Sequence, residues 1–119
     1  MERNNILIIM ADQLTWRALP YYGNTYAQTP NIDRICKNGI GFDACYCPFP
    51  LCQPSRAALW TGIYPHETNV LSNDRRWPSP PVPESIPTLG DTFRAAGYRT
   101  VHFGKTHDAG ALRGFECAP

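Results

Sequence analysis

Residues 52–62 read Cys-Gln-Pro-Ser-Arg-Ala-Ala-Leu-Trp-Thr-Gly. Pro54 suits the first turn of a helix, where its missing N–H costs nothing, and Gly62 suits the position just past the helix end. The stretch therefore predicts a short helix over residues 53–61 with Cys52 at its N-terminus. Unpaired N–H groups and the positive end of the helix dipole favour an anion at that point, either a thiolate or a bound oxyanion.

Arg56 stands one helical turn after Cys52, so we expect its guanidinium to reach back beside the cysteine. An isolated cysteine is more often a small buried apolar residue or half of a disulfide. A cysteine, a proline and an arginine at the entry of one helix favour a functional site instead. Leu59 and Trp60 are expected in the core.

Apolar runs before this helix predict further regular structure. Residues 5–10 form a continuous apolar run, typical of a strand buried on both faces. Thr29-Pro30-Asn31 opens a helix that ends at Gly39, and residues 40–45 return as a second strand.

The region after the motif helix begins with a long proline-rich connection over residues 63–87. Thr88 to Asp91 resembles a capping box, which predicts a helix that runs to Ala96 and is closed by Gly97. Residues 98–103 read as a third strand. The order of these elements predicts an α/β layer with a largely parallel sheet.

Polar residues follow two of the predicted strands. Asp12 and Gln13 follow the first, and Lys105 and His107 follow the third. Ligand sites of open α/β sheets lie outside the carboxyl ends of the strands, so these residues are candidates for the same site as Cys52. A carboxylate and an amide oxygen suit a hard cation, whereas a lysine and a histidine suit an anionic substrate.

The segment Cys-x-Pro-Ser-Arg at residues 52–56, extended through Thr61 and Gly62, resembles the signature of the type I, formylglycine-dependent sulfatases. The Lys105-x-His107 segment is similar to the Gly-Lys-x-His segment of the same family. The resemblance implies the N-terminal portion of an alkaline phosphatase-like α/β sandwich, with a largely parallel sheet and flanking helices. Residues 1–119 are then expected to be the N-terminal part of a sulfatase domain whose remainder lies further along.

The resemblance also implies a set of roles. Cys52 would be oxidised to formylglycine by a formylglycine-generating or sulfatase-maturing enzyme, and Arg56, Lys105 and His107 would complete the catalytic group. Asp12, Gln13 and the modified Cys52 would ligate a divalent cation, Ca²⁺ or alternatively Mg²⁺. The family usually has a second aspartate at the position of Gln13, so Gln13 either ligates the metal or hydrogen-bonds the nucleophile.

Three functions fit these residues. The first is a sulfuric ester hydrolase that cleaves a sulfate monoester of a small molecule or carbohydrate. The second is a phosphonate monoester or phosphodiester hydrolase of the same superfamily. The third is an inactive truncated fragment, because the remaining metal ligands and the general acid of such enzymes lie downstream. We expect the 119-residue chain alone to have little or no hydrolase activity.

Composition excludes some partners. A formal net charge of +1 without a basic stripe argues against nucleic acid, and no apolar run is long enough for a membrane. Residues 1–5 lack the features of a signal peptide, which allows a cytoplasmic location, while the family resemblance suggests a periplasmic or secreted one. The oligomeric state is left open.

Five cysteines leave free thiols and up to two disulfides as alternatives, although Cys45 and Cys47 are too close together to pair readily with each other. His66 and His102 are expected to be structural. Residues 75–77, Arg-Arg-Trp, could line a sugar pocket but are better interpreted as a solvated loop.

Overall fold

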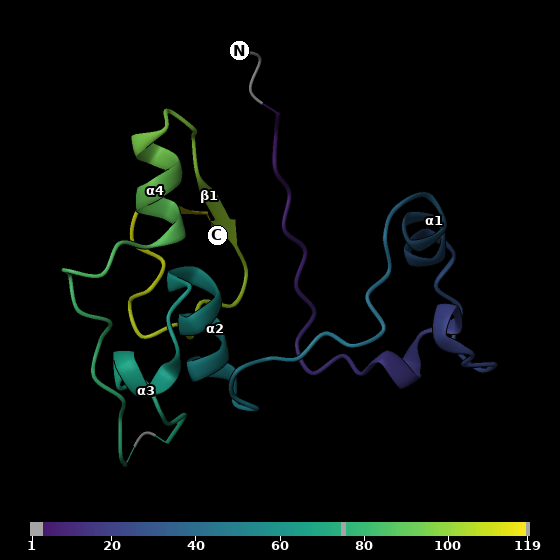
Figure 1. Ribbon diagram of the computed structural model, residues 1–119, viewed down its shortest axis with the longest axis horizontal. Helices are drawn as coiled ribbons and strands as arrows, with labels where there is room; N and C mark the ends of the chain where they lie inside the picture. The colour runs from purple at the N-terminus through teal and green to yellow at the C-terminus, as the bar shows by residue number, and fades with distance from the viewer. Residues whose placement is uncertain (1–3, 75, 119) are drawn as a thin grey trace. The chain divides into compact units, whose positions relative to one another are not determined.

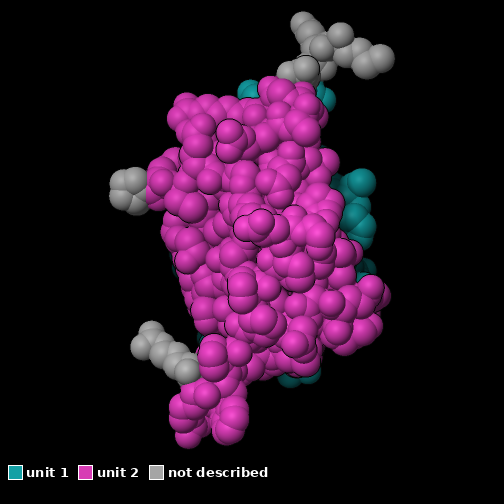
Figure 2. All heavy atoms as spheres, turned by 90° about the vertical axis from the view of Figure 1, so that its left-hand side faces the viewer, with its two compact units in different colours: residues 1–45 teal, residues 46–119 magenta. Residues whose placement is uncertain are grey.

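The computed structural model describes residues 4–74 and 76–118. The chain divides into two compact units, residues 1–45 and residues 46–119 (Figure 2). In the part of the chain described, no helix is long and apolar enough to cross a membrane.

The first unit consists of short helices joined by proline- and glycine-containing turns. Its elements are the 3-10 helices η1 (Trp16–Ala18) and η2 (Pro20–Tyr22) and the α-helix α1 (Pro30–Asn38). Each proline occupies a first helical position, where no N–H is needed, and the left-handed Gly23 (φ 96°) ends η2. The helix predicted to follow Thr29 and to stop at Gly39 is therefore confirmed.

The two strands predicted in this unit are wrong. Residues 5–10 and 40–45 form no ladder, and apolar side chains such as Leu7 and Ile9 are about four-fifths exposed, at 82% and 79%. An extended run makes no hydrogen bonds of its own, so it becomes a strand only where a neighbouring strand accepts and donates along it. Composition alone cannot supply that neighbour.

The described residues of the second unit form three helices and a small parallel sheet (Figure 1). The helices are α2 (Cys52–Thr61), α3 (Pro65–Thr68) and α4 (Leu89–Ala95), and the strands are β1 (Val101–Phe103) and β2 (Glu116–Ala118). Strands β1 and β2 pair in parallel with Val101 opposite Glu116. The unit is thus α/β with a parallel sheet, as predicted, although β1 is shorter than the predicted strand and neither α3 nor β2 was foreseen.

An apolar cluster holds the described part of this unit together. Trp60 on α2 packs against residues from the connection and from the turn before β2, and its ring lies edge-on to Phe115 at 5.4 Å between centroids. The buried members of the cluster are Ala57, Trp60, Val70, Val82, Ala111 and Leu112. Trp60 is in the core as predicted, whereas Leu59 is 46% exposed because it lies on the outer face of α2.

Helix α4 begins at the predicted capping box. The Thr88 hydroxyl accepts the Asp91 N–H, and the Asp91 carboxylate accepts the Thr88 N–H. The helix also begins against the turn before β2, because a Cβ on Gly90 would collide with the Arg113 carbonyl oxygen. Only glycine fits this close approach of two backbones.

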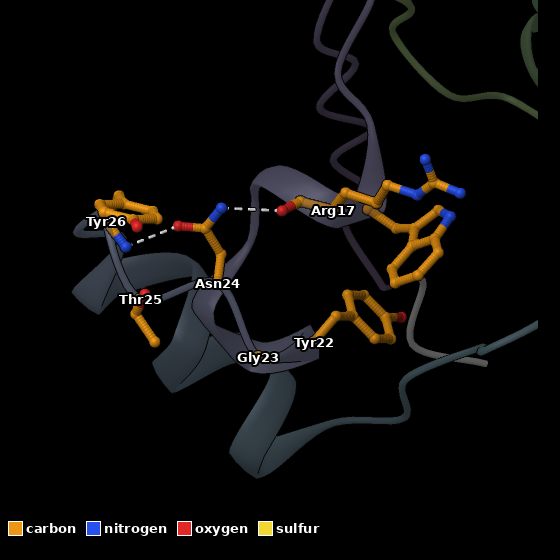
Figure 3. Close-up of a pocket in the computed structure, with 7 residues that line it drawn as sticks. Arg17, Tyr22, Gly23, Asn24, Thr25 and Tyr26 are labelled. Carbon is orange, nitrogen blue, oxygen red and sulfur yellow. Dashed lines mark hydrogen bonds between the residues drawn. The ribbon is translucent and has the colours of Figure 1, made fainter.

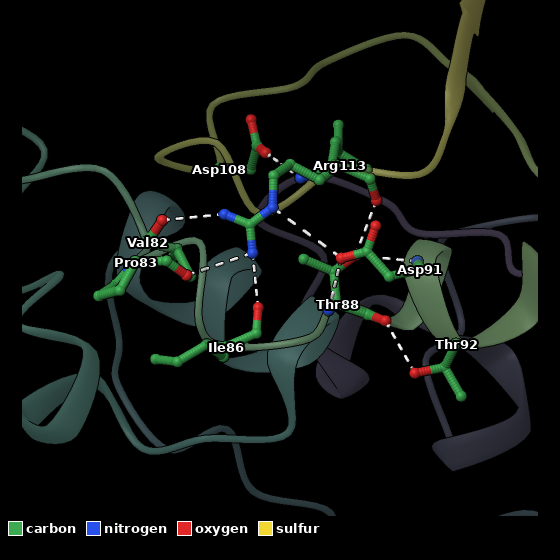
Figure 4. Close-up of polar contacts among 9 residues, drawn as sticks. Val82, Pro83, Ile86, Thr88, Asp91, Thr92, Asp108 and Arg113 are labelled. Carbon is green, nitrogen blue, oxygen red and sulfur yellow. Dashed lines mark hydrogen bonds and ion pairs between the residues drawn. The ribbon is translucent and has the colours of Figure 1, made fainter. Parts of the chain in front are cut away.

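Arg113 ties the proline-rich connection to the start of α4 (Figure 4). Its guanidinium donates to the carbonyl oxygens of Val82 at 3.0 Å and Pro83 at 3.2 Å, and also to that of Ile86. The same guanidinium lies 3.9 Å from the Asp91 carboxylate. A connection that reads as an unstructured loop is therefore held by one side chain from the far end of the unit.

Replacing Thr88 with alanine should lower the free energy of unfolding by about 1 to 2 kcal/mol, because the N-cap acceptor is lost. Chemical denaturation measures the change. Thr92→Ala in the same helix is the matched control and should cost less than about 0.5 kcal/mol, because Thr92 is exposed. Equal losses in the two variants would contradict the capping role.

Stability should also depend on the charge of Asp91. The Thr88 backbone N–H, then its hydroxyl, hold the pKa of Asp91 below its ordinary value of 3.8. A carboxyl whose pKa is lowered by folding stabilises the protein above the unfolded value, and this contribution disappears as the pH falls through the lowered folded value. Below about pH 4, the free energy of unfolding should fall less steeply with pH for Asp91→Asn than for the parent protein, as measured by chemical denaturation at several pH values.

Candidate active site

Cys52 is the first residue of α2, one position earlier than the predicted helix start. Leu51 before it is extended, and Gly62 ends the helix in the left-handed conformation at φ 70° with its N–H donated to the Ala58 carbonyl oxygen. The half-buried Cys52 carries a free thiol. The nucleophile candidate thus lies at the positive end of a helix, as the sequence predicted.

Asn73 contacts this helix end, and sequence reasoning missed it. Its Oδ1 atom accepts the Gln53 N–H at 2.8 Å, which satisfies a backbone donor that the helix itself cannot pair. The residues lie 20 positions apart, so no local pattern links them. The only hint in the sequence is an Asn-Asp pair within the proline-rich connection, residue types that often cap backbone groups.

Arg56 is buried, with 8% of its surface exposed, on the α2 face that meets the segment after β1. Its Nη1 atom donates to the Lys105 carbonyl oxygen at 2.8 Å, across 49 positions of sequence. A buried guanidinium needs such acceptors, because unpaired burial of a charge is costly. This bond joins the Cys52 helix to the Lys105-x-His107 segment.

Lys105 and His107 follow β1, as predicted, after a left-handed Gly104 at φ 86°. Lys105 is exposed and His107 is half-buried. His107 has a φ of 44°, unusual for a residue with a side chain, and within the described residues its buried Nδ1 atom has no hydrogen-bond partner. Cys52, Arg56, Lys105 and His107 therefore belong to one compact unit.

Asp12 and Gln13 belong to the other unit, where they form a turn with Gln13 at φ 55°. They do not follow a strand, so the prediction that places them at the carboxyl end of a strand is wrong. Their donors, a carboxylate and an amide oxygen, suit a hard cation such as Ca²⁺, but Ca²⁺ takes six to eight oxygen ligands. The described residues contain no group of three or more His, Cys, Asp or Glu side chains that could hold a metal, so this pair fits part of such a site.

The first unit also has an open surface pocket of about 300 Å³ (Figure 3). Trp16 and Tyr22 meet edge-on there at 6.1 Å between ring centroids, and the Arg17 guanidinium lies 5.4 Å from the centre of the Trp16 ring. Asn24 closes the turn by donating to the Arg17 carbonyl oxygen and accepting the Tyr26 N–H. The side-chain amide of Asn24 is thus engaged in holding the turn.

Other predicted features have simple outcomes. All five cysteines are free thiols, so the alternative of disulfides does not hold.

Arg76 and Trp77 are exposed, with Arg76 paired to Asp74 at 3.0 Å, which confirms the solvated loop for these two residues. Arg75 lies outside the described residues. Hydrogen bonds from Arg76 lower the pKa of Asp74.

Residues 4–113 match the family model for sulfatases. The chain belongs to the sulfatase family. A Delta 4,5-hexuronate-2-O-sulfatase of Bacteroides thetaiotaomicron is 50% identical over 97% of this chain and 24% of that enzyme. An N-acetylglucosamine-6-O-sulfatase of the same bacterium is 37% identical over 97% of this chain and 20% of that enzyme.

The solved structures agree with this assignment. A 2-O GAG sulfatase has a TM-score of 0.84 and 50% identity, and the match covers 90% of this chain and 23% of that chain. The fold is therefore that of the N-terminal portion of the alkaline phosphatase-like sulfatases. The chain spans a fifth to a quarter of the length of the curated relatives it matches.

Arg56→Ala should destabilise the protein by about 1 to 3 kcal/mol, because the Lys105 carbonyl oxygen loses its buried donor. Chemical denaturation measures the loss. Arg94→Ala, at an exposed position of α4, removes the same charge and should change stability by less than about 0.5 kcal/mol. A neutral Arg56→Ala variant would contradict the joining role of this side chain.

Proposed function

We propose that the protein hydrolyses a sulfate monoester with a nucleophile derived from Cys52. The observation that carries the proposal is the partly buried hydrogen bond from Arg56 to the Lys105 carbonyl oxygen. It links the helix that begins at Cys52 to the segment that carries a lysine and a histidine. Membership of the sulfatase family supports the same reaction.

The residues supply complementary chemistry. Once oxidised to formylglycine and hydrated, residue 52 offers two hydroxyls, one to attack sulfur and one whose deprotonation expels sulfate and re-forms the aldehyde. Arg56 and Lys105 provide positive charge for a nucleophile and for sulfate oxygens. The His107 imidazole offers a hydrogen-bond donor or acceptor.

A divalent cation, Ca²⁺ by preference, is the second part of the proposal. Asp12 would hold it through a carboxylate oxygen, with the Gln13 amide oxygen and an oxygen on modified Cys52 as further ligands. Bound there, the cation would lower the pKa of the attacking hydroxyl. A formylglycine-generating or sulfatase-maturing enzyme is the partner that this chemistry requires.

The proposed substrate is a sulfated carbohydrate. Relatives named for hexuronate 2-O-sulfate and N-acetylglucosamine 6-O-sulfate support this class. A choline-sulfatase of Rhizobium meliloti, 39% identical over 94% of this chain and 21% of that enzyme, makes a small sulfated molecule the alternative within the same reaction.

Two measurements on the complete protein, expressed with a maturing enzyme, test the proposal. Mass spectrometry should find the Cys52 peptide lighter by the difference between CH₂SH and CHO. Aryl sulfate should be hydrolysed faster than an aryl phosphodiester, and Cys52→Ala should lower kcat at least about 1,000-fold, as loss of a nucleophile does. Cys117→Ala, which removes an exposed thiol from β2, is the matched control and should retain activity.

An unmodified thiol in active protein would reject the formylglycine nucleophile. Clear preference for the phosphodiester would instead assign the protein to the phosphonate monoester or phosphodiester hydrolases of the superfamily. The 119-residue chain alone should show little or no turnover with either substrate.

A further inference from the structure

The turn at residues 107–109 has an unusual backbone. His107 and Ala109 both adopt left-handed conformations, with φ values of 44° and 53°. Each such residue costs on the order of 1 kcal/mol when it is not glycine, so the conformation persists only where surrounding contacts impose it. Two such residues flank Asp108, and backbone strain of this kind is typical of functional sites.

Asp108, between the two left-handed residues, accepts two hydrogen bonds from the residues that follow it. It is buried, with 8% of its surface exposed, and its Oδ2 atom accepts the Leu112 N–H at 2.6 Å (Figure 4). Its own carbonyl oxygen accepts the Ala111 N–H at 3.1 Å. A short charge-assisted bond of this kind is stronger and more directional than a neutral one.

The anchor points of Asp108 are themselves fixed. Ala111 and Leu112 are buried in the core cluster with Trp60 and Val82. The Val82 N–H donates to the Ala109 carbonyl oxygen at 2.8 Å, which secures the other side of the turn. The position of His107 is therefore set by a carboxylate that is bonded to the core, one residue away.

We propose that Asp108 is a positioning residue for His107. It holds the left-handed turn that carries the imidazole, and it does so by accepting the Leu112 N–H. The inference rests on the proposed function insofar as His107 takes part in the reaction. The mechanism requires only a hydrogen-bond acceptor at residue 108, because the bond to Leu112 is what imposes the backbone conformation.

Kinetics of the complete, matured enzyme test this role. Asp108→Ala should lower kcat by about 10- to 100-fold with little change in KM, as expected when a catalytic group is misplaced by about 1 Å. Asp108→Asn keeps an acceptor for the Leu112 N–H and should restore kcat to within about threefold of the parent enzyme. A folded Asp108→Asn variant as slow as Asp108→Ala would overturn the proposal.

Thr88→Ala is the matched control for lost stability. It removes a buried hydrogen-bonding side chain from the same unit, 1% exposed, but lies outside the His107 turn. Per folded molecule its kcat should match that of the parent enzyme. If Thr88→Ala and Asp108→Ala lower kcat alike, Asp108 has only a structural role and the proposal fails.

A double-mutant cycle separates action through His107 from independent action. In a His107→Ala background, Asp108→Ala should cause no further loss of kcat. An undiminished loss in that background would overturn the proposal. If Asp108→Ala does not fold, Asp108→Glu displaces the acceptor by one methylene group and should show the same loss of kcat and the same cycle.

A readout independent of activity distinguishes failure of this inference from failure of the proposed function. In the Asp108→Ala protein, the NMR signals of the His107 imidazole should shift or broaden while those of His66 and His102 stay in place. A parent enzyme inactive on sulfate esters would reject the proposed function but leave this measurement valid. Unchanged His107 signals would overturn the positioning role.

Discussion

A buried guanidinium must find hydrogen-bond acceptors inside the protein, and Arg56 finds one in the Lys105 carbonyl oxygen at 2.8 Å. The acceptor belongs to the backbone, so the bond fixes the path of the chain after β1 rather than one side chain. This hydrogen bond links the helix that starts at Cys52 to the segment that carries His107. The candidate site depends on this constraint.

The apolar cluster beneath the site makes that constraint possible. Ala57 and Trp60 bury one side of α2, while Ala111 and Leu112 bury the turn that follows His107. Helix α2, which begins at Cys52, and the turn that follows His107 thus pack on the same core. Arg113 adds a polar clamp on the long connection, so the segment that contributes Val82 cannot move away from the turn without breaking several hydrogen bonds.

The same arrangement explains where unusual backbone is tolerated. In the second unit, left-handed residues other than glycine occur at Asn69, which ends α3, and at His107 and Ala109, on either side of a buried carboxylate. Gln13 shares this conformation in the first unit, beside the carboxylate of Asp12. Strained conformations of this kind concentrate at functional sites, where side-chain direction matters more than local stability.

Local chemistry let the sequence alone determine the start and end of α2, the capping box of α4 and the proline-led start of α1. In each case the deciding residues lie within one turn of the helix end, so the signal is contained in a few neighbouring positions. The family motif likewise lies in one short segment, so the sequence alone indicates Cys52 and its helix. Tertiary structure decided the rest: residues 5–10 and 40–45 lack a paired neighbour, and Asn73 and Arg113 act through partners that lie 20 or more positions away along the chain. Strand pairing and buried hydrogen bonds join groups that only folding brings together, so no local pattern can encode them.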